Sequence, residues 1–588
     1  MREGWSYWLL PLHGLTTEGG EDLTGRFRRH DRRYVTQLNG TWDFAFLGED
    51  DPNTVDTSSV RFDDAMAVPG CFDATPSYAG RRGLAAYRTR AYLPEEGRYR
   101  LILDGVQHWC SVYVNGEKMR DHVGGFTRFS VDITGRRAEE AEIVVLVDNS
   151  FDYHRCPLHL EYFDWYHFGG IARPVELHQL ADLWIERLTV TTESIEPRRV
   201  VLAVDYDATA PPGRTELTIA CDGGIVLNEA VDLSSTPGRI ERVLELPGTQ
   251  LWSPGEPNLH VIHVTLGEDD ARERIGIRRI ETDGRRLLVN GEPVRLAGFN
   301  RHESHPQFGH AQPEALLISD VQQLQDMGCN FVRGSHYPQD IRFLDLCDEA
   351  GICVWQEAIG WQHTAEHLTD EAFVRAQLTN IEEMVSASAN RPSVILWGIL
   401  NESESHVPAS RPAYERLLGR LRELDPTRPV TYASNHPYHD LCLDLADVVS
   451  INRYPGWYFG RLEEVPKELD KITEHLDSVG QGDKPLIISE IGAGAIPGWR
   501  DQHGARWTER YQAELLDAVV RHLFVDRDRA CGLAVWLYND FRTTEEIRRL
   551  LGRPRGFNDK GVVDEYRRPK LAYGTIRRRF LALAEGGD

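Results

Sequence analysis

The second half of the chain repeats a pattern that few folds can accommodate. From about residue 278, short apolar runs of strand length alternate with stretches of helical periodicity. We predict strands at 294–299, 330–334, 352–356, 393–400, 429–433, 447–452, 485–489 and 532–537. Such alternation is typical of parallel strands joined by helices. Eight units over roughly 300 residues favour a closed (β/α)8 barrel.

One of the stretches between the predicted strands carries sequence signals for the beginning and the end of a helix. Pro313 opens it, and Gly328 follows it. Between them, Leu317, Val321 and Leu324 recur at i, i+4 and i+7. Proline near the start and glycine just past the end are typical of a helix. The spacing therefore predicts an amphipathic helix between the first two barrel strands.

The first half of the chain has the patterns of β structure, in two blocks. The first block, 35 to about 180, carries strand-like runs and an Asn115-Gly116 turn, which favours a hairpin because both central residues need positive φ. The second block, 181–277, is about a hundred residues long, which suits an immunoglobulin-like sandwich. We therefore predict domains at 1–180, 181–277 and 278–588, two β-sandwiches followed by the barrel.

Charge and composition limit the partners. Lys and Arg total 66 and Asp and Glu total 91, so the formal net charge is −25. So acidic a chain is not expected to bind nucleic acid, because phosphate neutralisation needs clustered cations. It does not exclude a small anionic substrate, because distant acids are screened beyond about 8 Å at physiological salt. The local charge at the site decides that question.

The same survey bears on the cellular setting. No segment approaches the ~20 apolar residues that cross a bilayer, and no signal-peptide core is apparent. The nine cysteines are scattered, odd in number and without a CxxC pair. These features favour a cytoplasmic protein with reduced thiols, no membrane partner and no disulfide framework.

Two acidic residues stand where a barrel places its catalytic groups. Glu402 and Glu490 each follow an apolar strand directly, so each is expected at the carboxyl end of the barrel. A pair of carboxyl groups is what glycoside hydrolysis requires, and a retaining enzyme holds them about 5–5.5 Å apart. The alternative is that each glutamate caps the next helix or pairs with an arginine of the barrel.

Several motifs now identify a family. The segments GFNRHE (298–303), RGSHYP (333–338), WGILNE (397–402) and SE (489–490) resemble glycoside hydrolase family 2 in order and spacing. The LWSP segment at 251–254 also resembles the family's sequence before its barrel. Together these motifs are highly specific, and the likeness runs from about residue 35 to the end.

The resemblance implies a fold and a set of roles. The family combines a jelly-roll sugar-binding domain, an immunoglobulin-like domain and a TIM barrel, which agrees with the reading above. By resemblance, Glu402 is the general acid/base, Glu490 is the nucleophile and Asn401 binds the sugar 2-hydroxyl. His302 and His336 correspond to the family's active-site histidines. Relatives often form dimers or tetramers, so a homo-oligomer is a possible state.

Further segments resemble the β-glucuronidases of the family. By that likeness Tyr454 bonds the nucleophile, and Tyr458 contacts the substrate. The segment around 164–173 is similar to a first-domain loop that reaches the barrel, so Asp164 is expected to bind sugar hydroxyls, and Trp536 matches the aromatic residue on the last strand. Ile491 departs from the pattern, because a tyrosine usually follows the nucleophile there.

The sharpest sign of the substrate is Asn558-Asp559-Lys560-Gly561. It resembles the Asn-x-Lys motif with which β-glucuronidases hold the substrate carboxylate, since an amide and an ammonium can grip a carboxylate through charge-assisted hydrogen bonds. The alternative is a plain polar turn. Residues 300–309 resemble β-galactosidases more closely, which is contrary evidence.

We therefore expect a retaining, exo-acting β-glucuronidase that uses a β-glycoside or oligosaccharide substrate. Double displacement needs Glu402 to hold a proton and Glu490 to be ionised. The alternatives are a β-galactosidase or β-galacturonidase on the same scaffold and, more remotely, a carbohydrate-binding protein without catalysis. No cofactor is expected. No metal is expected either, because the histidines lack HExxH spacing and no Cys/His quartet exists.

Overall fold

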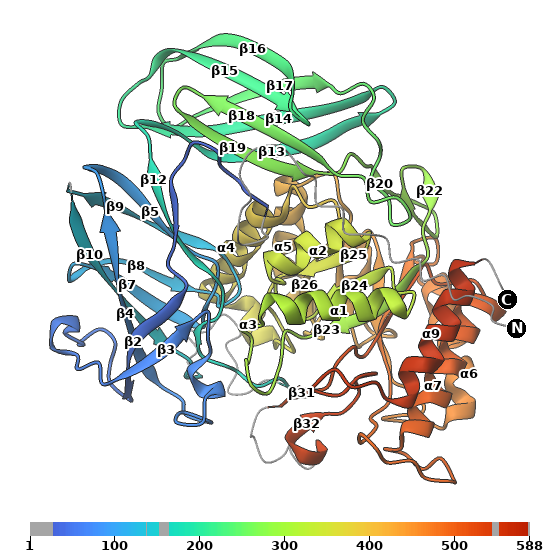
Figure 1. Cartoon of the computed structure of the whole chain (residues 1–588). Helices are drawn as coiled ribbons and strands as arrows, with labels where there is room; N and C mark the ends of the chain where they lie inside the picture. The colour runs from blue at the N-terminus through green and yellow to red at the C-terminus, as the bar shows by residue number, and fades with distance from the viewer. Residues whose placement is uncertain (1–26, 137, 152–163, 544–551, 586–588) are drawn as a thin grey trace, which may run out of the picture.

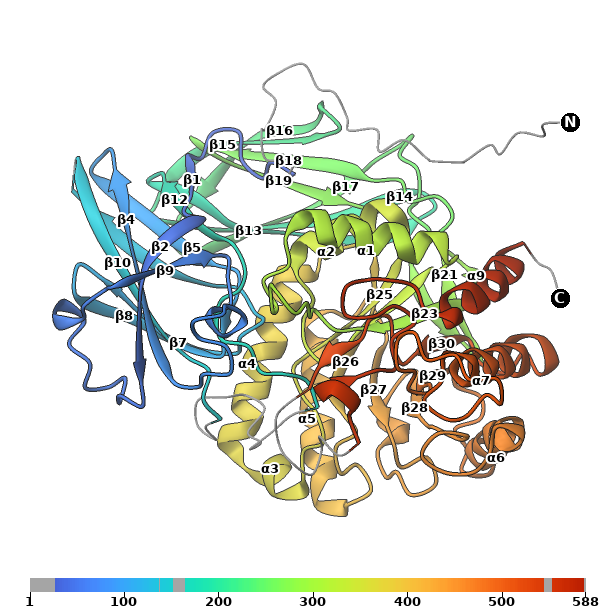
Figure 2. The ribbon, with the colours of Figure 1, turned by 60° about the horizontal axis from the view of Figure 1, so that its bottom comes forward.

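The computed structural model describes residues 27–136, 138–151, 164–543 and 552–585. Figures 1 and 2 show a β-sandwich (blue) beside a barrel (yellow to red), with further sheets (green) lying across both. The predicted fold class, two β-sandwich domains followed by an eight-stranded barrel, is confirmed. Cys156 lies outside the described residues, and the other eight cysteines are free. None of the described helices is long and apolar enough to cross a membrane.

The first sandwich consists of two antiparallel sheets. One has the order β1 (Val35–Gln37), β12 (Val175–Leu180), β5 (Gly97–Leu103), β9 (Phe129–Gly135). The other has the order β3 (Asp64–Val68), β2 (Gly40–Gly48), β4 (Leu84–Leu93), β10 (Glu139–Asp148), β7 (Trp109–Val114), β8 (Glu117–Val123). The predicted hairpin joins β7 to β8, with φ of 50° at Asn115 and 82° at Gly116. Alternate side chains of β5, β10 and β12 close the core between the sheets.

The second sandwich follows at once. Its sheets have the orders β13 (Leu183–Ile195), β14 (Arg198–Ala208), β17 (Gly238–Glu245) and β16 (Gly224–Leu233), β15 (Gly213–Cys221), β18 (His260–Leu266), β19 (Asp269–Ile275). β18 alternates buried and half-buried residues, as the sequence pattern requires. A small sheet, β20 (Ile280–Asp283), β21 (Arg286–Val289), β22 (Glu292–Pro293), leads into the barrel.

Eight parallel strands close the barrel, each within a few residues of its predicted position. They are β23 (Leu296–Arg301), β24 (Phe331–Gly334), β25 (Cys353–Glu357), β26 (Val394–Asn401), β27 (Val430–Ser434), β28 (Val449–Asn452), β29 (Leu486–Ile491) and β30 (Gly532–Val535). Every residue of these strands is buried, because side chains fill the barrel and helices cover it.

Helices cover the outside of the barrel. They are α1 (Glu314–Asp326), α2 (Ile341–Ala350), α3 (Ala365–Thr369), α4 (Glu371–Ser388), α5 (Arg411–Leu424), α6 (Val465–Ser478), α7 (Glu509–Arg521) and α9 (Leu571–Ala584). The predicted helix is α1. It buries Leu317, Val321 and Leu324, and Gly328 follows it with φ of 72°.

The first sandwich reaches the barrel where the strands end. Phe126 stacks on Tyr337 with ring centroids 3.9 Å apart, and Trp165 belongs to the same apolar cluster as the barrel core. Arg173 donates to Glu303 at 3.0 Å, and both side chains are buried. This contact fixes residues 164–173 of the first domain beside the carboxyl ends of the strands.

Candidate active site

Glu402 and Glu490 lie at the carboxyl ends of two barrel strands, β26 and β29, which are separated by β27 and β28. Glu402 follows β26 directly, and Glu490 is the fifth residue of β29. The two carboxyl groups are close enough that the charge of Glu402 raises the pKa of Glu490. The structure therefore brings together the two residues that the sequence selected as a catalytic pair.

Glu490 is held by one cation and one hydroxyl group. Arg333 Nη1 donates to its Oε1 at 2.8 Å, and the Tyr454 hydroxyl donates to its Oε2 at 2.7 Å. Burial and, to a smaller extent, the charge of Glu402 raise the pKa of Glu490 to about 8, against the opposing effects of Arg333 and Tyr454. The Tyr454 contact is the one that the family resemblance predicts.

The raised pKa of Glu490 bears on the charge states expected for catalysis. Double displacement is expected to need Glu402 protonated and Glu490 ionised, whereas the raised pKa shifts Glu490 towards its protonated form. The physical reason is desolvation together with like-charge repulsion. Because the two carboxyl groups interact, the charge on Glu402 affects the protonation of Glu490.

Arg333 is the centre of the hydrogen-bond network around Glu490. Besides Glu490 it donates to both oxygens of Glu357, at 2.9 and 3.1 Å, and to Asn300 and Asn401. Burial raises the pKa of Glu357 to about 7, and Arg333 opposes that shift. Glu357 thus forms an ion pair with Arg333 and, through it, helps to orient the site.

Glu402 is held differently, by two amide groups. Gln362 Nε2 donates to Oε2 at 2.9 Å, and Asn452 Nδ2 donates to Oε1 at 3.0 Å. The Asn452 amide also donates to Asn401 Oδ1 at 3.0 Å. The sequence pointed to neither Gln362 nor Asn452. Asn452 at least stands at the end of a predicted strand, whereas Gln362 lies in a loop and gave no signal.

Neutral histidines and a tryptophan line the site beside the pair. His336 stacks on Trp536 with centroids 5.3 Å apart, and His302 packs edge-on against the same ring at 5.5 Å. Burial lowers the pKa of both histidines well below its ordinary value, so both are neutral. Within the described part of the chain, His302 Nε2 and Asn401 Nδ2 have no hydrogen-bond partner. Both atoms are able to meet sugar hydroxyls.

The predicted carboxylate-binding pair lies on a short hairpin after the barrel. β31 (Phe541–Arg542) pairs with β32 (Phe557–Asn558), and Lys560 follows. Lys560 is 2% exposed, and its Nζ donates to Asn558 Oδ1 at 3.4 Å. The Tyr458 ring lies 5.2 Å from the same nitrogen. Burial lowers the pKa of Lys560, whereas Tyr458 and Asp164 oppose that shift.

Asp164 joins this group from the first sandwich. Asn558 Nδ2 donates to Asp164 at 2.9 Å, and Arg553 holds the same carboxylate in a forked arrangement at 2.8 and 2.9 Å. The sequence reading missed Arg553, although it stands only five residues before Asn558. Arg553 and Lys560 together carry two positive charges, against the one negative charge of Asp164.

Comparison with known proteins agrees with this geometry. The profile of "Glycosyl hydrolases family 2, TIM barrel domain" matches residues 280–584, more than half of the chain. The chain belongs to glycoside hydrolase family 2. The resemblance stated from the motifs is thereby confirmed, and the remote alternative of a carbohydrate-binding protein without catalysis gives way to a glycoside hydrolase.

Three relatives illustrate which enzymes of family 2 this chain is similar to. A β-glucuronidase of Paenibacillus borealis is 30% identical over 83% of this chain and 85% of its own. The structure of a family 2 β-galacturonidase from Eisenbergiella tayi, bound to galacturonate, superposes with a TM-score of 0.87 at 32% identity over 95% of this chain and 98% of its own. The structure of a Ruminococcus gnavus β-glucuronidase in complex with D-glucaro-d-lactam superposes with a TM-score of 0.83 at 25% identity, over 94% of this chain and 98% of its own.

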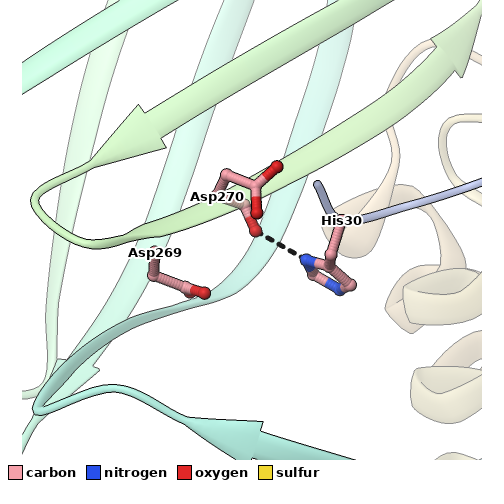
Figure 3. A group of neighbouring side chains, drawn as sticks. All are labelled: His30, Asp269 and Asp270. Atoms are coloured by element: carbon pink, nitrogen blue, oxygen red, sulfur yellow. Dashed lines mark hydrogen bonds between the residues drawn. The ribbon is translucent and has the colours of Figure 1, made fainter. Parts of the chain in front are cut away.

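One further cluster of this glycoside hydrolase has a composition that suits a metal. His30, Asp269 and Asp270 lie together at the edge of the second sandwich (Figure 3). The Asp270 carboxylate accepts two backbone N–H groups of residues 31–32, at 2.7 and 2.8 Å, and Asp269 accepts from the Ile185 N–H at 2.7 Å. Because these oxygens already serve the backbone, the cluster fastens the segment around His30 to β19, and we assign it no metal.

Proposed function

We propose that this family 2 glycosidase is a retaining, exo-acting β-uronidase whose first substrate class is the β-glucuronides. In the first step Glu490 attacks the anomeric carbon while Glu402 protonates the departing aglycone oxygen. In the second step Glu402 removes a proton from water, which displaces Glu490 and releases glucuronate. Both steps follow the two-carboxylate scheme of retaining glycosidases.

The observation that carries the proposal is the buried charge of Lys560. No acidic side chain of the described residues lies within 4.0 Å of its Nζ. A buried ammonium group without a close anion is unfavourable. A sugar carboxylate would supply that anion, with the Asn558 amide as a second donor. It would also balance the excess positive charge of Arg553 and Lys560 over Asp164.

A β-galacturonide is the second candidate substrate. It carries the same carboxylate and differs from a glucuronide only in the orientation of the hydroxyl group at C4. The observation in its favour is the likeness to the Eisenbergiella tayi β-galacturonidase, at an identity similar to that of the β-glucuronidases. Neutral β-galactosides fit less well, because they would leave Lys560 without its anion.

A panel of aryl glycosides tests the proposal. We expect hydrolysis of p-nitrophenyl β-D-glucuronide, or of the galacturonide, at a kcat/KM at least a hundredfold above that of the matching glucoside or galactoside. Faster turnover of the neutral glycosides than of either uronide would refute it. Proton NMR of the first-formed sugar reports retention, and an α-configured product would exclude the double displacement.

The Lys560→Ala variant separates the role of the ammonium group from general damage. We expect kcat/KM on the uronide to fall by roughly a hundredfold, because a charge-assisted hydrogen bond in a buried site is lost. Residual turnover of a neutral glycoside should stay within about threefold. The matched control is Lys467→Ala, which removes an exposed lysine of α6 and should leave both activities unchanged. Equal losses on both substrates would refute carboxylate binding by Lys560.

A further inference from the structure

The two carboxyl groups of the site have partners of different charge. Glu490 faces the guanidinium group of Arg333, whereas Glu402 accepts from the amide groups of Gln362 and Asn452. A guanidinium group stabilises the ionised form of its partner, so Arg333 opposes the burial that raises the pKa of Glu490. A neutral amide stabilises a carboxylate more weakly and so permits it to cycle between its protonated and ionised forms. The partners therefore match the roles proposed for the two glutamates.

Gln362 is fixed in place by an extension of the barrel sheet. The Asn401 N–H donates to the Gly360 carbonyl at 3.1 Å, and the Gln362 N–H donates to the Asn401 carbonyl at 2.7 Å. These bonds attach the loop after β25 to the last residue of β26, which directly precedes Glu402. The backbone of Gln362 is consequently held beside Glu402, the residue whose carboxyl group accepts from the Gln362 side chain.

The backbone at this junction is strained on both sides. Gln362 has φ of 51°, Leu400 of 37° and Glu402 of 50°, in the left-handed region that residues with a β-carbon seldom adopt. Strain of this kind persists where the surrounding structure imposes it, often at functional sites. Here it places the Gln362 amide and the Glu402 carboxyl group 2.9 Å apart.

We propose that Gln362 is a positioning residue of the general acid/base. Its amide N–H fixes the orientation of Glu402 and stabilises the negative charge that develops on that carboxyl group as its proton passes to the leaving oxygen. An interaction that strengthens as charge develops lowers the barrier to the first step. The proposal rests on the acid/base role of Glu402 under the proposed function.

The leaving group of the substrate provides the test. Departure of phenol, a weak acid, depends on protonation by Glu402, whereas 2,4-dinitrophenolate departs without it. In Gln362→Met, which retains the length of the side chain but not its hydrogen bond, we expect kcat/KM on the phenyl uronide to fall roughly 10- to 100-fold. On the 2,4-dinitrophenyl uronide it should fall by less than about threefold. The matched control is Gln322→Met, on the exposed side of α1, with no change on either substrate.

The pH profile gives a second readout that a merely structural role would not move. Gln362 donates to the ionised form of Glu402, so its loss favours the protonated form. In Gln362→Met the midpoint of the alkaline limb of kcat/KM should therefore move to higher pH. An equal loss on both aglycones, or an unmoved alkaline limb, would overturn the proposal. Glu402→Gln is measured alongside it. If Glu402→Gln itself shows no dependence on the leaving group, the assignment of Glu402 fails and the role of Gln362 fails with it.

Discussion

At the scale of single residues, Glu490, the proposed nucleophile, and Glu402, the proposed acid/base, depend on one another through charge. Glu490 has a pKa of about 8 because it is buried and because Glu402 is close by. The catalytically competent form of the pair carries one proton, with Glu490 ionised and Glu402 protonated. The enzyme therefore requires that the pair has not lost its last proton, and this sets an upper limit on the working pH.

The pH dependence of kcat/KM follows from that shift. The last proton of the pair leaves near pH 8, so we expect activity on p-nitrophenyl uronides to fall above that pH with a midpoint of about 8. In Glu402→Gln the charge that raises the pKa of Glu490 is absent. Its kcat/KM on a 2,4-dinitrophenyl uronide should then rise with pH to a plateau, with a midpoint below 8. An alkaline midpoint below pH 7 in the wild type would contradict this account.

The sequence pointed to the proposed catalytic residues more readily than to their hydrogen-bond partners. Glu402 and Glu490 follow apolar runs, and that signal is local, so it is visible without a structure. Gln362 and Arg553 act through contacts between separate loops, and nothing in their immediate sequence indicates those contacts. The raised pKa of Glu490 was not foreseen for the same reason, since burial and the proximity of a second carboxyl group are properties of the folded chain.

At the scale of elements, the barrel strands were predicted well because each is buried from end to end and bounded by turn residues. The irregularities at their ends were not predicted. Register shifts interrupt the pairing of β26 with both of its neighbours, and the shift against β27 falls at Ile399–Asn401, just before Glu402. Bulges of this kind depend on pairing between strands that are far apart in sequence.

Gly398 of β26 leaves room for an aromatic side chain that contacts the site. A β-carbon at Gly398 would lie 1.9 Å from Nε1 of Trp355 on β25, and Arg333 lies over the Trp355 ring at 4.6 Å. In Gly398→Ala the indole ring must move, and Arg333, which holds Glu490, moves with it. We expect a loss of stability of about 1–3 kcal/mol and a fall in kcat that exceeds any change in KM.

The control for this substitution is Gly419→Ala in α5, where a β-carbon would meet no atom within 4 Å. Alanine is the better helix former, so this variant should be as stable as the wild type or slightly more stable. Thermal unfolding and steady-state kinetics of both variants decide the matter. Full activity of a normally stable Gly398→Ala protein would show that Trp355 does not support Arg333.

At the scale of the whole molecule, the site belongs to two domains. Asp164 of the first sandwich meets Arg553 and Asn558 of the barrel domain, so neither domain holds the complete constellation. The order of the domains could be predicted from strand patterns and motifs. That the first domain contributes a side chain to the site followed only from the family resemblance, because no pattern in one segment reveals which other segment it will contact.

The net charge of −25 is the property of the whole chain that bears on its substrate. Under the proposed function, the acidic surface would repel a uronate from a distance, and Lys560 would attract it at contact. Salt separates these effects, because the Debye length falls from about 30 Å at 0.01 M to about 8 Å at 0.15 M, while a buried contact is screened much less. We therefore expect the inhibition constant of free glucuronate to decrease about two- to fivefold over that range.

The methyl ester of glucuronate is the matched control, because it keeps the sugar and removes the charge. Its inhibition constant, measured against the same aryl uronide at the same two salt concentrations, should not change. If glucuronate instead binds more weakly as salt is added while the ester is unaffected, attraction by the cations of the site extends into solvent and outweighs the repulsion from the surface. In that case the local excess of Arg553 and Lys560 over Asp164 governs encounter as well as binding.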